Sequence, residues 1–374
     1  MRILHVAPTY FPAVRYGGPI YSTHGLCKAL AARGHDVHVF TTNVDGDGVS
    51  AVPLDAIAML DGVKVRYFPA GFGRRLYRSP QMGAALENEI ASFSIVHTHS
   101  VFLWPPAVAA RKARRKGVAT VVSPRGMLVA DLIQARSRAV KTAWINMVDR
   151  ANVENADVVH VTSPVERREI ENLGLTTRAF ATIPNGIDLP AEKQRVAHAA
   201  PFVLCLGRLN WKKGLDRLIL AMRNVPQARL VIAGNDEENY TAQLRAIAEA
   251  ARVLDRVQFV GHVEGESKFQ LMRDCAVFAL ASRSENFGNV ALEAMACGAP
   301  LVLTPEVGFA AEAEQAGAAV VVAGDPEPFG VAIARVLASP GMRERMRTAG
   351  MAAARSYSWA DIAARMERVY ESVA

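Results

Sequence analysis

Cysteine is scarce in this sequence, and its spacing argues against two kinds of small protein. The four cysteines lie far apart, and none belongs to a C-x-x-C pair. This arrangement suits neither a structural zinc site nor a disulfide framework. A reducing compartment is the simplest interpretation, so we expect a cytoplasmic protein.

Long apolar segments are also missing. The apolar stretch after Arg2 is interrupted at Pro8, so it lacks the continuous apolar core of a secretory signal. The longest run without a charged residue, residues 90–110, contains two histidines and two prolines. A buried strand followed by the start of a helix explains this run better than a transmembrane helix. We therefore expect no membrane-spanning segment and only peripheral membrane contact.

Three widespread catalytic signatures are absent as well. The sequence contains no G-x-x-x-x-G-K-[ST], no H-E-x-x-H and no G-x-S-x-G, which argues against the best-known NTPases, metalloproteases and serine hydrolases. Asp45-Gly46-Asp47 imitates a metal-binding D-x-D, but it lies in a turn-rich loop. We therefore expect neither a bound metal nor an organic cofactor.

The positive charge is confined to the first half of the chain. Residues 1–190 contain 22 Lys and Arg and 15 Asp and Glu, which accounts for the whole net charge of +7. Such an excess suits an anionic membrane surface or a phosphorylated acceptor, although solvated helix faces are an equally ordinary explanation. The basic residues gather in three groups: Arg74, Arg75 and Arg78; Arg111, Lys112, Arg114, Arg115 and Lys116; and Arg136, Arg138 and Lys141.

Apolar, β-rich runs alternate with helix-like stretches, which predicts an α/β fold. Continuous apolar strands separated by helices are typical of a parallel sheet that is covered on both faces. Helix-like stretches at 20–33 and 107–116 each end at a glycine. The strands expected in the first half are residues 3–7, 37–41, 63–68, 95–98, 119–122, 158–161 and 179–183.

The pattern starts again after a polar stretch at 191–200, and the 374 residues are long enough for two domains. We expect a first domain of residues 1–190, a second of residues 200–355 and a closing helix, 358–374, that can pack back on the first. Doubly wound domains bind ligands at the carboxyl ends of their strands, here facing a central cleft. The second series of strands is expected at 202–206, 230–233, 257–260, 277–280, 301–303 and 319–322.

The strongest local signal is the basic, glycine-containing loop at 207–216. It follows the first strand of the second domain and leads into a helix, which places Arg208 and Lys213 where parallel sheets bind anions. Two fixed cations there suit a diphosphate. A solvated loop that happens to be basic is the alternative.

A second signal, residues 284–293, joins a strand to a helix between two glutamates. Backbone amides at such a helix start attract anions. A continuous helix would separate Glu285 and Glu293 by about 12 Å, beyond the roughly 5 to 9.5 Å of a glycosidase pair, so we expect distinct roles for the two carboxylates. The helix start itself comprises Asn286, Phe287, Gly288 and Asn289.

A weaker signal, Gly17-Gly18-Pro19, follows the first strand and opens a helix. Glycine here lets the backbone approach a phosphate or a sugar closely.

Taken together, these motifs resemble glycosyltransferase family 4 (group 1), over nearly the whole chain. The motifs stand in the family's order: Gly17-Gly18, Gly34-His35-Asp36-Val37, residues 183–188, Gly207-Arg208 with Lys213-Gly214, and Glu285 with Glu293. The resemblance implies a GT-B fold of two Rossmann-like domains, with the first on the acceptor side and the second binding the nucleotide-sugar. It also implies retention of anomeric configuration. It further implies that Arg208 and Lys213 hold the diphosphate of a nucleotide-sugar, that Glu285 contacts the transferred sugar and that Glu293 binds the ribose.

Arg125 departs from this resemblance. Many relatives have a histidine after the fifth strand, where this chain has Arg125 in Ser123-Pro124-Arg125-Gly126-Met127-Leu128. That form resembles a subgroup associated with bacterial exopolysaccharide and lipopolysaccharide assembly. Arginine stays protonated, so it is no general base near neutral pH, but it can bind a donor phosphate or orient an acceptor. His99 is a second candidate on the acceptor side.

We therefore predict a retaining, metal-independent glycosyltransferase that moves a sugar from a UDP- or GDP-sugar to a glycan or a lipid-linked acceptor. The expected setting is bacterial cell-surface polysaccharide assembly, with no nucleic-acid partner. A GT-B epimerase or sugar phosphorylase is the alternative enzyme, and a nucleotide-sugar-binding regulator is the alternative without catalysis.

Overall fold

The computed structural model describes residues 1–54, 56–129, 133, 138–191, 193–196, 200–236 and 239–374, which form two compact units. Unit 1 comprises Met1–Gly186 and Trp359–Ala374, and unit 2 comprises Ile187–Ser358. The division falls slightly before residue 190, the expected end of the first domain. The reason is local, because Ile187 is already paired with Ser358 and its N–H donates to Tyr357 O at 2.9 Å.

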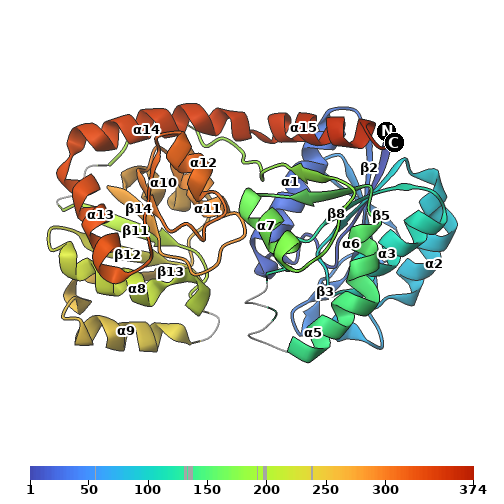
Figure 1. Cartoon of the computed structure of the whole chain (residues 1–374), viewed down its shortest axis with the longest axis horizontal. Helices are drawn as coiled ribbons and strands as arrows, with labels where there is room; N and C mark the ends of the chain where they lie inside the picture. Colours follow the sequence, from blue (N-terminus) through green and yellow to red (C-terminus); the bar gives the residue numbers. More distant parts are fainter. Residues whose placement is uncertain (55, 130–132, 134–137, 192, 197–199, 237–238) are drawn as a thin grey trace. The chain divides into compact units, whose positions relative to one another are not determined.

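Unit 1 is built on an eight-stranded sheet of order β10-β9-β8-β7-β1-β2-β6-β5 (Figure 1). All seven expected strands are present, and β5 is an addition. The expectation of a parallel sheet is wrong at this edge, because β5 and β6 are joined by a tight turn at Asp61-Gly62 and pair antiparallel. The strands are β1 (Arg2–Val6), β2 (Asp36–Thr42), β5 (Ile57–Leu60), β6 (Val63–Phe68), β7 (Ile95–His99), β8 (Ala119–Ser123), β9 (Val158–Val161) and β10 (Phe180–Thr182).

Helices cover both faces of this sheet because side chains alternate along each buried strand. On β1, Ile3 packs with helices α1 (Gly18–Ala32) and α15 (Trp359–Glu371), while its neighbour Leu4 packs with α2 (Pro80–Glu89) and α3 (Trp104–Arg115). The closing helix α15 thus completes the core of unit 1 (Figure 1). Trp359 lies so close to Gly25 and Gly186 that a side chain at either position would collide with its ring.

The remaining elements of unit 1 lie around the ends of the sheet. A short hairpin precedes β5, and a helical segment after β8 contains one π-helical turn at Ile145–Asp149. These elements are the hairpin strands β3 (Val44–Asp45) and β4 (Gly48–Val49), and the helices α5 (Arg138–Trp144), α6 (Arg150–Glu154) and α7 (Pro164–Asn172).

Unit 2 is built on a six-stranded parallel sheet of order β13-β12-β11-β14-β15-β16. All six expected strands are present: β11 (Phe202–Leu206), β12 (Arg229–Ala233), β13 (Val257–Gly261), β14 (Val277–Leu280), β15 (Leu301–Leu303) and β16 (Ala319–Val321). Its helices are α8 (Leu215–Ala221), α9 (Tyr240–Ala250), α10 (Gly265–Asp274), α11 (Asn289–Ala296), α12 (Ala310–Gln315), α13 (Pro326–Ala338) and α14 (Pro340–Ala354).

Each sheet has one point where the order of its strands reverses. In unit 1 this switch point lies between β1 and β7, and in unit 2 it lies between β11 and β14. Loops leave a sheet in opposite directions at such a point, so the carboxyl ends of the two strands flank a natural ligand site. Residues 207–216 and 284–293 follow β11 and β14, Gly17-Gly18 lies after β1 at the start of α1, and His99 ends β7.

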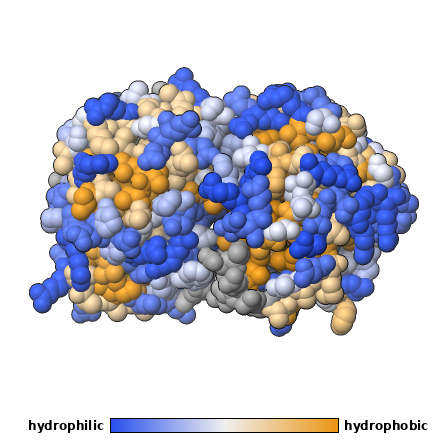
Figure 2. All heavy atoms as spheres, viewed as in Figure 1, coloured by the Kyte–Doolittle hydropathy of each residue, from blue (hydrophilic) through white to orange (hydrophobic). Residues whose placement is uncertain are grey.

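Among the described residues, no helix has the length and apolar character that crossing a membrane requires. On the face shown in Figure 2, hydrophobic residues lie in small groups among hydrophilic ones.

Candidate active site

The switch point of unit 2 is closed by two loops that touch. After β11 the chain forms a tight turn at Trp211–Lys213, in which the Asn210 side chain accepts from Lys212 N at 3.1 Å. Gly214 follows with φ +59°, and a Cβ at this position would overlap the carbonyl oxygen of Ala281. Glycine is therefore required here on two counts, and it brings the loop after β11 against the loop after β14.

This close approach joins Lys213 to Glu285. The Lys213 ammonium forms an ion pair with the Glu285 carboxylate, and 14% and 23% of the two side chains are exposed. Arg208 lies on the same loop with an exposed side chain. Two residues predicted from separate motifs thus meet at the switch point, each partly shielded from water.

The expected separation of Glu285 and Glu293 rested on a continuous helix, and that premise is wrong. Helix α11 begins only at Asn289, because Gly288 takes a left-handed conformation (φ +92°) before it. Glu285 instead lies in an extended bridge, in which its N–H donates to Glu306 O at 3.1 Å and its carbonyl accepts from Gly308 N at 2.9 Å.

The two glutamates still differ in their surroundings. Glu293 lies on α11 and pairs with Lys268 of α10 at 2.9 Å, with 23% and 20% of the side chains exposed. No sequence motif pointed to Lys268, because a lone lysine on a polar helix carries no signal before the helices are packed.

The residues at the start of α11 do not all face a ligand. Phe287 is buried against Phe309 with 5.4 Å between ring centroids, so only its backbone is available for binding. Its carbonyl accepts from Phe309 N at 2.8 Å. Asn286 and Asn289 are partly exposed.

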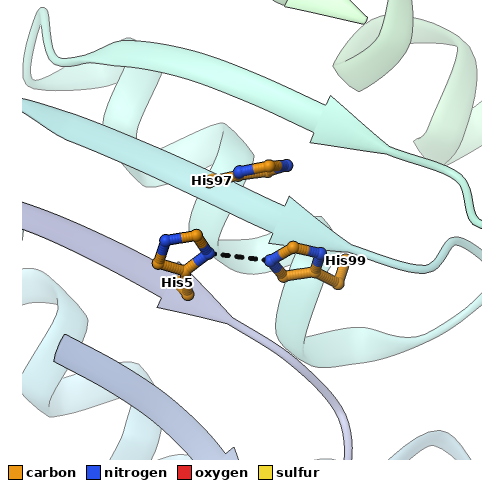
Figure 3. A group of neighbouring side chains, drawn as sticks. All are labelled: His5, His97 and His99. Atoms are coloured by element: carbon orange, nitrogen blue, oxygen red, sulfur yellow. Dashed lines mark hydrogen bonds between the residues drawn. The ribbon is translucent and has the colours of Figure 1, made fainter. Parts of the chain in front are cut away.

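The switch point of unit 1 carries a layer of histidines. His5 comes from β1, whereas His97 and His99 lie on the same face of the neighbouring β7, and His5 bonds to His99 (Figure 3). His160 of β9 adds a fourth ring at 5.6 Å from His97. Sequence reasoning singled out only His99, because which histidines share a face depends on strand order.

One hydrogen-bonded chain through this layer has a defined direction. A carbonyl only accepts, so His160 Nε2–H donates to Ile183 O at 2.9 Å and His160 Nδ1 accepts from the Ser123 hydroxyl at 2.7 Å. The Ser123 oxygen then accepts from His97 Nε2–H at 2.7 Å, and His97 Nδ1 accepts from the Tyr370 hydroxyl at 2.6 Å. Both imidazoles in this series of hydrogen bonds, those of His160 and His97, are neutral.

A second chain starts at Arg125. Its Nε and Nη2 donate to His99 Nδ1 at 3.3 and 3.1 Å, so His99 carries its proton on Nε2 and donates to His5 Nδ1 at 2.9 Å. The remaining His5 Nε2–H is buried without a partner in the described part of the chain. Arg125 Nη1 also donates to the Asn185 side chain at 3.0 Å.

Burial keeps these histidines neutral. Burial first, and then the Arg125 charge, lower the pKa of His5 and of His160 to about 3. The pKa values of His97 and His99 are also well below the usual range, first because of burial and then because of neighbouring rings or Arg125. The layer therefore accepts hydrogen bonds from a cation without becoming charged.

Three of these rings are close enough to be considered as metal ligands. Ring nitrogens of His5, His97 and His99 lie within 4.8 Å of one another. Both nitrogens of His97 are already used, by Ser123 and Tyr370, and His99 accepts from the Arg125 guanidinium. A metal ion would therefore displace several hydrogen bonds beside a fixed positive charge, so the donor set fits a cation poorly.

The remaining glycine and aspartate motifs lie near the start of α1. Gly17 has φ +71° and precedes the helix, and no atom lies within 4 Å of the place a Cβ would take. Gly18 is exposed. Asp45 pairs with Arg15 at 2.6 Å, and Gly46 N donates to the Tyr16 hydroxyl at 2.8 Å.

Comparison with known proteins identifies the family. Residues 190–352 match the family model described as "Glycosyl transferases group 1", and residues 17–186 match the "Glycosyl transferase 4-like domain". The chain belongs to the group 1 glycosyltransferases. Group 1 glycosyltransferases transfer sugars, so the enzyme class predicted from the motifs is confirmed at this level.

Individual relatives cover almost the whole of this glycosyltransferase. A D-inositol 3-phosphate glycosyltransferase of Xylanimonas cellulosilytica is 27% identical over 412 residues, which is 99% of this chain and 95% of that protein. A glycogen synthase of Mycobacterium tuberculosis is 29% identical over 406 residues, covering 99% and 94%.

Solved structures confirm the GT-B fold. A sucrose-phosphate synthase of Thermosynechococcus elongatus superposes with a TM-score of 0.79 at 23% identity, over 100% of this chain and 99% of the other. HepE of Anabaena, solved with UDP and glucose, superposes with a TM-score of 0.74 at 19% identity over the full length of both chains.

The basic surface of this glycosyltransferase is less uniform than the sequence suggested. In the group on α3, Lys112 and Lys116 both pair with Glu87. Arg111, Arg114 and Arg115 are exposed, and Arg114 Nη1 donates to Ala151 O at 3.0 Å. Arg136 and the side chain of Arg138 lie outside the described residues.

A cavity of about 370 Å³ lies beside this basic surface. Trp104 and Trp144 line it, together with Arg111, Arg114 and the largely exposed Met147. Aromatic, basic and exposed apolar side chains therefore meet at one place on unit 1.

Proposed function

We propose that this group 1 glycosyltransferase is a retaining, metal-independent enzyme that moves a sugar from a UDP- or GDP-sugar to a glycan or a lipid-linked acceptor. Its setting would be bacterial cell-surface polysaccharide assembly in the cytoplasm, with peripheral contact to the inner face of the membrane. The observation that carries the proposal is the Lys213–Glu285 pair at the switch point of unit 2. HepE, which has the same fold, has been solved with UDP-glucose, which supports a nucleotide-sugar donor.

In this proposal, unit 2 binds the donor and unit 1 binds the acceptor. Arg208 and Lys213 hold the diphosphate, and the helix start at residues 286–289 adds backbone amides and a helix dipole. Glu285 contacts the transferred sugar, and Glu293, oriented by Lys268, binds the ribose. Gly17 and Gly18, which lie at the start of α1 in unit 1, would let the backbone approach a phosphate or a sugar closely.

Stabilisation of the leaving group would dominate the chemistry. The bond from the anomeric carbon to the diphosphate breaks, and negative charge develops on the departing phosphate oxygen. In this proposal the Arg208 and Lys213 cations stabilise that charge. Groups that are already held in position can do so without further reorganisation. The acceptor hydroxyl attacks from the same face without a protein nucleophile, as the family resemblance implies, and its proton passes to the departing phosphate oxygen.

The basic surface of unit 1 supports the membrane part of the proposal. Arg111, Arg114 and Arg115 are exposed on α3, and the cavity beside them is lined by two tryptophans. Cations attract anionic lipid, and tryptophan suits the interface between water and lipid. Reversible association would bring the enzyme near a lipid-linked acceptor.

Calorimetry with UDP, GDP and ADP, followed by assays with the matching nucleotide-sugars and lipid-linked acceptors, tests the proposal. Transfer that requires both donor and acceptor, with the anomeric configuration retained, would support it. Conversion of the nucleotide-sugar without an acceptor would indicate an epimerase, and consumption of phosphate would indicate a phosphorylase. Binding without turnover would indicate a regulator.

A further inference from the structure

Arg125 is a cation whose hydrogen-bond partners are all neutral. Its guanidinium donates to His99 Nδ1 and to the Asn185 amide oxygen, and neither carries a charge. Among the described residues, no carboxylate accepts from it. Burial lowers the pKa of Arg125, but the guanidinium still does not lose its proton near neutral pH.

Glu166, the carboxylate that most affects the Arg125 charge, is hydrogen-bonded elsewhere. Glu166 Oε1 accepts from Gly126 N at 2.6 Å, and Oε2 accepts from Thr162 N at 2.8 Å and from its hydroxyl at 2.9 Å. Glu166 therefore fixes the backbone beside Arg125 and influences the guanidinium only from a distance. Cys27 and Tyr370, the other groups that affect its charge, are buried and have raised pKa values.

The backbone at Arg125 is also held in a costly conformation. Its φ of +57° lies in the left-handed region, which is unfavourable for a residue with a side chain. Such conformations persist where the surrounding structure imposes them, and they gather at functional sites. Here the loop aims a guanidinium into the layer of neutral histidines at the switch point of unit 1.

We propose that Arg125 is the receptor for an oxyanion, a carboxylate or a phosphate, on the acceptor substrate. The guanidinium is partly exposed, and His99 and Asn185 fix its plane, so the donors they leave unused can bind an oxyanion. The anion supplies the counter-charge that the neutral partners lack. This inference rests on the proposed function, which places the acceptor on unit 1.

Nuclear magnetic resonance of the full chain, labelled with ¹⁵N at histidine, tests this inference directly. The probes are inorganic phosphate and acetate, added at constant ionic strength, and the signal is the His99 Nδ1 resonance, assigned with His99→Gln. We expect a saturable shift in the wild type, because an anion on the guanidinium changes its hydrogen bond to His99. Arg125→Gln should weaken this binding by about tenfold to a hundredfold, the range for hydrogen bonds to charged groups.

Two controls locate the anion. Arg208→Ala, which alters unit 2, should leave the His99 shift intact, and Arg125→Lys, which keeps the charge but not the planar fork, should bind more weakly than the wild type. Absence of a saturable shift in the wild type, an equal shift in Arg125→Gln, or loss of the shift in Arg208→Ala would overturn the inference.

Calorimetry separates this inference from the proposed function. Arg125→Gln should bind UDP or GDP as the wild type does, because the donor lies on unit 2. A tenfold loss of nucleotide affinity in this variant would assign Arg125 to the donor and overturn the acceptor assignment. Failure of the wild type to bind any nucleotide would instead overturn the proposed function, while the phosphate titration would still report on Arg125.

Discussion

The cations at the two switch points of this glycosyltransferase have different kinds of partner. In unit 2, Lys213 and Lys268 are each paired with a glutamate. In unit 1, Arg125 is held by neutral groups, with four uncharged histidines packed behind it. A cation paired with a carboxylate can exchange it for an anionic ligand, and the charge around it stays balanced. A cation with only neutral partners has no counter-charge until an anion binds.

The largest expected difference between the units is their response to acid. The folded pKa values of His5, His97, His99 and His160 lie below the usual 6.5, so these rings stabilise the fold fully above pH 6.5 and lose that contribution as the pH falls. Each ring takes up about one proton on unfolding. The free energy of unfolding should therefore fall by up to about 5 kcal/mol per pH unit.

Hydrogen exchange measured by mass spectrometry at pH 7, 6 and 5, corrected for intrinsic rates, resolves the two units. Protection of β1, β7, β8 and β9 should fall first. The variant His262→Gln serves as a control, since this unit 2 histidine is largely exposed. Equal loss of protection in both sheets would remove the contrast.

Loss of the cations of unit 2 should give the next largest effect. Arg208→Ala and Lys213→Ala should each reduce transfer about tenfold to a hundredfold, because a hydrogen bond to a charged group contributes roughly 1.5 to 3 kcal/mol. Steady-state kinetics with the identified donor measures this. Arg229→Ala, at the opposite end of the unit 2 sheet, is the matched control, and near-normal turnover in both test variants would refute the diphosphate assignment.

A smaller effect is expected from the second ion pair of unit 2. Lys268→Met removes the partner of Glu293, and a partly exposed pair of this kind contributes up to about 1 kcal/mol. Nucleotide affinity measured by calorimetry should therefore fall about threefold to fivefold. An unchanged dissociation constant would mean that Lys268 does not orient Glu293 toward the ribose.

The arginines and the lysines of residues 111–116 on unit 1 should contribute differently to membrane association. Replacing Arg111, Arg114 and Arg115 by Gln should weaken binding to anionic vesicles, since each cation near the surface contributes about 1 kcal/mol. Replacing Lys112 and Lys116 by Gln should matter less, because Glu87 already pairs with both.

Vesicle sedimentation at low and high salt, with neutral vesicles as the reference, measures this difference. Equal partitioning to neutral and anionic vesicles would favour a soluble acceptor.

The smallest effect is expected from chelation. Transfer should be unchanged in EDTA, because protein cations are proposed to stabilise the leaving group and the histidine layer fits a metal ion poorly. Assays with and without EDTA measure this. Loss of activity that Mg²⁺ or Mn²⁺ restores would contradict the prediction and revive Asp45 and Asp47 as candidates.

Much of the architecture could be predicted from the sequence, because burial on both faces makes parallel strands into continuous apolar runs. The runs at 202–206, 277–280 and 301–303 match β11, β14 and β15 residue for residue. The edge strand β5 was not predicted, because a strand that is partly exposed need not form a continuous apolar run. The prediction of a continuous helix from Glu285 to Glu293 was wrong, because hydrophobic periodicity does not reveal that Gly288 adopts a left-handed conformation.

By itself, the sequence determined the family, the two α/β units and the candidate residues that lie within local motifs, since such motifs depend on neighbours along the chain. Only the tertiary structure decided which side chains meet. The pairing of Lys213 with Glu285, the role of Lys268 and the histidine layer behind Arg125 all join residues that are distant in sequence. Strand order and the close packing of loops at each switch point create these contacts, and neither leaves a pattern in the chain that periodicity or composition can detect.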